Sequence, residues 1–148
     1  MADIASAEVT TPLSLLGCGV TTELAQQPDV SANFTGRIRL FGSAANAPVF
    51  KWEMDSRGLV AAWALSDGGV GATVISGAAA TWPRWLRIEE SGGQVLFRTA
   101  TATTFTTVQS VPHGERLDSM TLQVQVGYPL QAGGDRATLR IDNVNLGP

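Results

Sequence analysis

The sequence contains few of the side chains that build reactive or metal sites, since it has one cysteine and one histidine in 148 residues. A single cysteine, Cys18, cannot form a disulfide within the chain, and we interpret it as a small buried apolar residue. One cysteine and one histidine also fall short of the four ligands of a structural zinc site. His113 stands in a Pro-His-Gly turn, which predicts a surface position, and no G-x-S-x-G motif is present. These absences argue against a Ser-His-Asp hydrolase.

Long apolar runs and an excess of basic charge are also missing. No segment approaches the roughly 20 apolar residues of a membrane-spanning helix. The formal net charge of −3 argues against a general nucleic-acid-binding protein, which carries a basic patch or stripe. No lysine or arginine precedes Arg37, so the N-terminal region lacks the basic segment of a secretion signal. We expect a soluble protein without a signal peptide, whose partners are neither nucleic acid nor membrane.

Alternation of apolar and polar residues with a period of two is abundant. It runs through FTGRIRLF, VFKWEM, GLVAAWAL, MTLQVQVGY and ATLRIDNVNL. Such alternation is typical of half-buried β-strands, and turns rich in Gly, Asp and Ser separate the runs. The pattern predicts an all-β fold, an antiparallel two-sheet β-sandwich. The last run keeps a single apolar face only if Asp142 and Asn143 form a bulge.

Residues 1–32 differ from residues 33–148 in being rich in Ala, Thr and Ser, with a short apolar island from Leu13 to Val20. Two alternatives stay open for this segment. It forms either an extended N-terminal arm that docks on a neighbouring subunit, or a tail followed by a first strand that completes the sandwich. The remainder, residues 33–148, is predicted to form one β-sandwich.

The four tryptophans divide into two pairs. Trp52 and Trp63 lie within apolar alternation and are predicted core residues. A proline follows Trp82 and interrupts strand pairing, which places Trp82 at the start of a strand or at a sheet edge. Trp85 shares the polar face of its strand with Arg87, where the alternatives are cover by the chain itself, a protein interface or a sugar-stacking platform. The candidate ligand or interface residues are Trp82, Arg84, Trp85, Arg87 and Tyr128.

Trp-Leu-Arg-Ile at 85–88, a Ser-Gly-Gly turn at 91–93, FTTVQSV at 105–111 and the final run with its Asp-Asn pair resemble the concanavalin A-like lectin/glucanase jelly-roll (LamG-like) superfamily. The resemblance implies a jelly roll with a concave face or edge loops used for glycans. Its glycosidases carry alternating carboxylates on one strand. Glu53 and Asp55 are the nearest match, but Arg57 stands where a third carboxylate would fall, so we expect a non-catalytic member and no enzyme. Many lectin-like sandwiches bind calcium through loop carboxylates, for which the weak candidates are Asp67, Asp135, Asp142 and Asn143; otherwise we expect no metal and no cofactor.

Two function classes remain open. The first is a non-catalytic structural or adhesion subunit of a larger assembly, specified as a bacteriophage virion surface protein (capsid decoration or tail-associated) that contacts other copies of itself or capsid or tail proteins. The absence of catalytic constellations, the Ala/Gly/Thr-rich β-composition and the candidate arm favour it. The second is a carbohydrate-binding module that recognises cell-surface glycans through exposed Trp and Tyr side chains.

Overall fold

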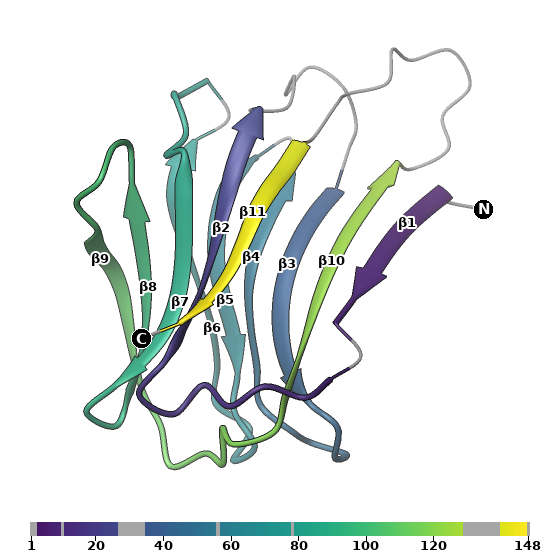
Figure 1. Cartoon of the computed structure of the whole chain (residues 1–148), viewed down its shortest axis with the longest axis vertical. Helices are drawn as coiled ribbons and strands as arrows, with labels where there is room; N and C mark the ends of the chain where they lie inside the picture. The colour runs from purple at the N-terminus through teal and green to yellow at the C-terminus, as the bar shows by residue number, and fades with distance from the viewer. Residues whose placement is uncertain are drawn as a thin grey trace.

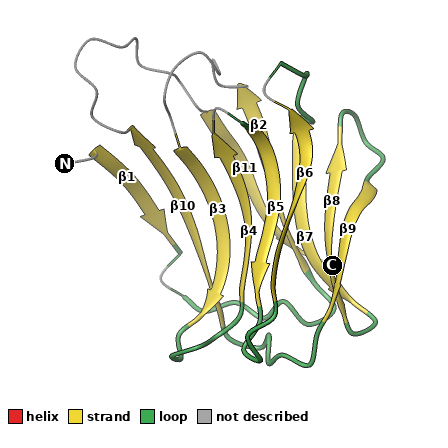
Figure 2. Ribbon diagram, turned by 180° about the vertical axis from the view of Figure 1, so that it is seen from behind, coloured by secondary structure: helices red, strands yellow, loops and turns green. Residues whose placement is uncertain are grey.

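Eleven β-strands and no helix make up the part of the chain that the structure describes (Figure 2). This computed structural model describes residues 3–9, 11–26, 35–55, 57–77, 79–128 and 140–147, with side chains from Ser6 to Gln125 within these ranges. The strands are β1 (Asp3–Glu8), β2 (Gly19–Gln26), β3 (Thr35–Gly42), β4 (Val49–Asp55), β5 (Gly58–Ala64), β6 (Val70–Gly77), β7 (Trp85–Ser91), β8 (Gln94–Ala100), β9 (Thr106–Pro112), β10 (Met120–Tyr128) and β11 (Arg140–Gly147). Within these ranges the structure contains no helix able to cross a membrane.

The strands form two antiparallel sheets packed as two layers (Figure 1). The six-stranded sheet has the order β1-β10-β3-β4-β5-β6, and the five-stranded sheet has the order β11-β2-β7-β8-β9. Strands distant in sequence therefore lie side by side, with β10 between β1 and β3, and β2 between β11 and β7. The predicted all-β antiparallel sandwich is confirmed.

The N-terminal segment supplies one strand to each sheet. β1 is paired along its length with β10, and β2 is paired with both β7 and β11. Leu15, in the connection between β1 and β2, is fully buried in the core. Residues on both sides of position 32 thus build the same two sheets.

The period-two pattern places the core between the sheets. In β4, Phe50, Trp52 and Met54 are each at most 1% exposed, and the residues between them are only partly buried. Trp52 meets Phe97 of the opposite sheet edge to face, with ring centroids 5.2 Å apart, and Trp63 lies 6.3 Å from the same ring. Aromatic pairs of this kind add about 0.5–1.5 kcal/mol beyond the area they bury. The predicted core placement of Trp52 and Trp63 is confirmed, with Trp63 partly buried against the core.

The last strand contains the predicted irregularity. Asp142 pairs with Glu23, whereas the next pair in the register is Asn145 with Thr21. Three residues of β11 therefore advance against two of β2, so a bulge lies between Asp142 and Asn145. The sequence required a bulge at Asp142 and Asn143, within this interval. Residues 137–139 of the predicted run lie outside the described part of the chain.

In the edge strand β6 the larger apolar side chains Val70 and Val74 face solvent, whereas a glycine faces the core. Val70 is 76% and Val74 is 64% exposed. Gly71, directly opposite Trp63 on β5, has the Trp63 indole against it, since a Cβ built on Gly71 would lie 2.6 Å from Trp63 Cε2. Gly71 therefore makes room for the ring that closes this edge of the core.

Replacing Gly71 with alanine is expected to destabilise the fold, because the new methyl group overlaps the Trp63 ring and forces it to move. Overpacking of this kind costs about 1–3 kcal/mol. Gly77→Ala in the same strand is the matched control, since nothing lies within 4 Å of the added Cβ, and its effect is expected within about 0.5 kcal/mol. Urea unfolding followed by tryptophan fluorescence measures both variants. Equal stabilities for the two variants would contradict the packing described.

Candidate functional site

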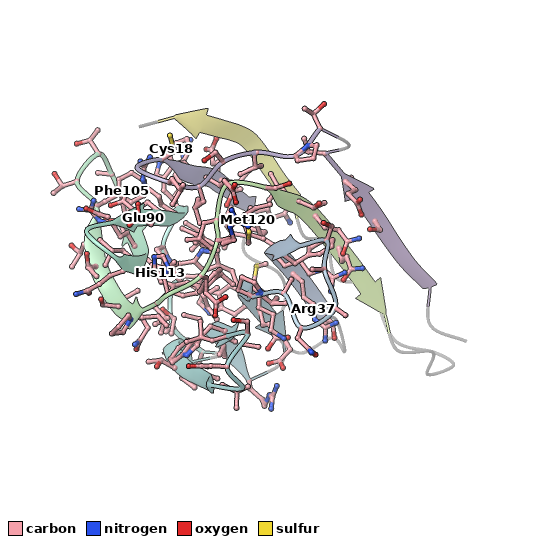
Figure 3. All side chains as sticks on the ribbon, turned by 90° about the horizontal axis from the view of Figure 1, so that it is seen from below. Cys18, Arg37, Glu90, Phe105, His113 and Met120 are labelled. Atoms are coloured by element: carbon pink, nitrogen blue, oxygen red, sulfur yellow. The ribbon has the colours of Figure 1, made fainter. Side chains whose placement is uncertain are left out.

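The outer face of the six-stranded sheet carries a patch of charged and amide side chains from β10, β3 and β4. They stand in two cross-strand rows, Gln123–Arg39–Lys51 and Gln125–Arg37–Glu53, called the polar face below. Side chains directly opposite on antiparallel strands have Cβ atoms about 4.5–5.5 Å apart, so the six form one continuous surface. Figure 3 shows Arg37 on one side of the molecule and Phe105, which precedes β9 of the five-stranded sheet, on the opposite side.

Glu53 is the hydrogen-bond acceptor for two basic side chains of the polar face. Its Oε1 atom accepts hydrogen bonds from Arg37 Nε at 3.2 Å and from Lys51 Nζ at 2.9 Å. The side chains of Arg37, Lys51 and Glu53 are 43%, 30% and 22% exposed. These groups are held in place by one another and remain within reach of a ligand.

Arg39 is held in a different way, by neutral groups. Its Nε atom donates to Gln123 Oε1 at 2.6 Å, and its guanidinium lies 4.5 Å from the centroid of the Phe41 ring. Gln123 in turn donates from Nε2 to Glu8 Oε2 at 3.0 Å. The arginine is thereby fixed in orientation, with its charge directed over the sheet next to an aromatic ring.

The same two rows continue onto β5 and β6 as small apolar residues. Lys51 is opposite Ala62, which is opposite Ala72, and Glu53 is opposite Val60, which is opposite Val74. None of these β5 and β6 side chains has a hydrogen-bonding group. The polar face therefore borders an apolar strip in which Ala62 is buried, Val60 is partly exposed, and Ala72 and Val74 are exposed. The sheet presents donors, acceptors and apolar surface together.

The outer face of the five-stranded sheet contains a closed ionic network. Glu89 accepts hydrogen bonds from Arg87 Nε and, at 2.8 Å, from Arg98 Nη1. Arg87 also donates to Thr21 Oγ1 at 2.9 Å, and Arg98 donates to the Phe105 carbonyl at 3.1 Å. Burial raises the pKa of Glu89, but the hydrogen bonds and charges of Arg87 and Arg98 outweigh it and hold the pKa below its ordinary value. The network uses these charges internally, to stabilise the sheet.

The candidates predicted around Trp85 are placed differently from one another. Trp82 is 4% exposed and belongs to the core, and its Nε1 donates to the Gly77 carbonyl at 3.0 Å. The prediction of Trp82 as a ligand or interface residue is therefore wrong, because its ring cannot reach a ligand. Trp85 is half-buried, with the Arg84 guanidinium 5.7 Å from its ring centroid and Arg84 paired with buried Glu23.

The remaining predicted site residues are only partly placed. Arg87 belongs to the ionic network, and the Tyr128 side chain lies outside the described residues. Of the calcium candidates, Asp67 accepts a hydrogen bond from the Gly69 backbone at 2.8 Å in the β5–β6 turn. Asp135 and the side chains of Asp142 and Asn143 fall outside the description. No group of three or more His, Cys, Asp or Glu side chains among the described residues is arranged to hold a metal ion.

The two carboxylates nearest to a glycosidase pair are both engaged in ion pairs. Burial raises the pKa of Asp55, but hydrogen bonds from Arg57 and its charge lower it overall. A general acid needs a raised pKa to hold its proton near neutral pH. Asp55, paired with Arg57 at the end of β4, therefore has the wrong environment for that role.

His113 is buried, which corrects the prediction of a surface turn residue. Its side chain is 5% exposed, its Nδ1 atom accepts a hydrogen bond from the Glu115 backbone, and its Nε2 atom lies 3.8 Å from Glu90. Glu90 also accepts backbone hydrogen bonds from Gly17 and Gly93, which lower its pKa. Through Glu90, these contacts link the β1–β2 connection, the β7–β8 turn and the β9–β10 connection. Figure 3 shows Glu90 and His113. The cluster is a structural junction.

Comparison with known proteins supports the fold. No protein-family model and no curated protein sequence matches the chain. A toad ovary galectin solved in complex with thio-digalactose is similar, with a TM-score of 0.55 and 16% identity over 96% of this chain and 98% of that chain. A functionally unknown protein from Saccharomyces cerevisiae has a TM-score of 0.50 and 15% identity over 97% of this chain and 73% of that one. These likenesses show the fold alone: the chain is a lectin-like β-sandwich.

Glu89→Gln is expected to destabilise the protein at pH 7 by about 1–3 kcal/mol, because two partly buried guanidinium groups lose their charged acceptor. A carboxylate with a depressed folded pKa stabilises above its unfolded pKa, and this contribution is lost as the pH falls through the folded value. Stability of the wild type should therefore fall below about pH 4.5, the ordinary value for Glu89, and less steeply in Glu89→Gln. Urea unfolding from pH 7 to pH 3 measures this, with Asp118→Asn, an exposed carboxylate, as the control. Identical acid dependence in the wild type and Glu89→Gln would contradict the assignment.

Proposed function

We propose that this chain is a carbohydrate-binding module that holds a saccharide on the polar face of β10, β3 and β4. The observation that carries the proposal is the two rows of fixed donors and acceptors beside an apolar strip. Saccharides present hydroxyl groups around a ring with apolar C–H faces. A binding site for them needs a few oriented polar groups next to apolar surface.

The fold supports this proposal over the whole chain. The toad galectin, which covers 96% of this chain, was solved with thio-digalactose, so a sandwich of this kind holds a sugar in that protein. The two carboxylates on the outer side of β4 are both engaged in ion pairs. Glu53 is shared between Arg37 and Lys51, and Asp55 is paired with Arg57. A binding function without catalysis fits these contacts.

The polar face is a better candidate than the predicted platform around Trp85. Arg84 donates a hydrogen bond to Glu23, and Arg87 donates hydrogen bonds to Glu89 and Thr21. Trp82 is buried. The alternative of a virion subunit that contacts protein partners stays a prediction, and the comparisons contain nothing that favours it.

Arg37→Ala is expected to weaken saccharide binding about tenfold or more, since a hydrogen bond from a charged donor contributes about 1.5–3 kcal/mol. Arg57→Ala, which removes an exposed arginine from the β4–β5 turn, should keep full affinity. A glycan array identifies the bound saccharide, and isothermal titration calorimetry then compares the variants. Trp85→Ala tests the other sheet. Absence of binding to every saccharide on the array would reject the function, and loss of binding only in Trp85→Ala would move the site to the five-stranded sheet.

A further inference from the structure

The polar face concentrates positive charge on an acidic protein. The chain has a formal net charge of −3 with ten basic residues, and Arg37, Arg39 and Lys51 stand together on the adjacent strands β3 and β4. Glu53 is the carboxylate among them, and it serves Arg37 and Lys51 through the same oxygen atom. The centre of the face therefore carries more positive than negative charge.

Among the described residues, Arg39 and Lys51 share no carboxylate, unlike the directly opposed Arg87 and Arg98 on the other sheet, which both pair with Glu89. Arg39 and Lys51 are directly opposite each other in the antiparallel register of β3 and β4, and like charges in such positions destabilise a sheet. Among the described residues, no carboxylate forms an ion pair with Arg39, whose partners are the Gln123 amide and the Phe41 ring. Glu8 reaches only Gln123, at the β1 edge. An anion placed between Arg39 and Lys51 would relieve this repulsion.

The surroundings favour an anion carried on a sugar over a free ion. Beside Lys51 the sheet continues with Ala62 on β5, and beside Arg39 it continues with Phe41, which is opposite Val49. Ala62 is buried, so the apolar surface beside the two charges comes from the partly exposed Phe41 and Val49 and from the exposed Ala72 of β6, which is opposite Ala62. A ligand with an anionic group joined to a ring can use the charges and the apolar surface together.

We propose that the ligand is an acidic saccharide, whose carboxylate or sulfate group binds between Arg39 and Lys51. This inference rests on the proposed function and specifies the substrate class of the same face. Arginine binds carboxylate and sulfate oxygens through its planar donors, and lysine adds a compact charge. Acidic saccharides should therefore bind more tightly than their neutral counterparts, with a preference that weakens as salt rises.

The test uses the full chain on a glycan array with matched neutral, sulfated and carboxylated forms, among them lactose, 6′-sulfolactose and 3′-sialyllactose. Calorimetry on the matched forms at low and high salt follows. At least one acidic form should bind tenfold or more tightly than its neutral counterpart, and the array then shows whether sulfate or carboxylate is preferred. Arg39→Gln and Lys51→Gln should remove that difference, and the control Arg116→Gln, an exposed arginine before β10, should retain it.

The outcomes separate this inference from the proposed function. Equal affinity for neutral and acidic forms would overturn the inference and leave saccharide binding intact, as would a preference that survives in both Arg39→Gln and Lys51→Gln. Inorganic sulfate that binds as tightly as the sulfated sugar would also overturn it, because the saccharide would then contribute nothing. No binding to any saccharide would reject the function itself. Circular dichroism of each variant verifies that the sandwich is folded, and both substitutions are at partly exposed positions.

Discussion

The structure depends on one constraint, which is that each strand of the six-stranded sheet must fill the space between the layers with every second side chain. Phe50, Trp52 and Met54 of β4 are buried for this reason, and Trp52 packs against Phe97 of the other sheet. The alternate residues must then face outward. Since the register of neighbouring strands is set by the same packing, outward residues line up in cross-strand rows, and the polar face is a direct consequence of how the core is packed.

Strands whose two faces differ in polarity could be predicted from the sequence. β3, β4 and β10 follow strict alternation in the sequence, and the bulge of β11 follows from keeping one apolar face through Asp142. The edge strands β1 and β6 could not be predicted in this way. β6 exposes Val70 and Val74 and turns Gly71 inward against Trp63, which reverses the usual pattern. The orientation of β6 depends on the Trp63 ring of β5, and the sequence period within β6 does not reveal that contact.

The candidate site could be predicted less well than the fold, because it is made by pairing between strands. Arg39 and Gln123 are 84 positions apart in sequence yet hydrogen-bonded, and only the order β10-β3-β4 brings them together. The prediction that Trp82 lies in a binding site was wrong for a related reason, because its burial depends on contacts outside its own segment. The proline after Trp82 correctly indicates a break before β7, but burial of Trp82 depends on the Gly77 carbonyl, which accepts its indole N–H. Periodicity assigned Trp85 to the correct face and could not show that Arg84 packs on it.

The two outer faces differ in how far their charges are satisfied, and this difference bears on function. On the five-stranded sheet Arg87 is also directly opposite Arg98, but both arginines form ion pairs with the same carboxylate, Glu89. On the six-stranded sheet Arg39 is directly opposite Lys51, and the local arrangement opposes stability. Sequences normally agree with their fold at every level, and the positions that break the rule tend to be functional. An unfavourable pair held on rigid strands, beside apolar surface, is therefore where a ligand of opposite charge gains most from binding.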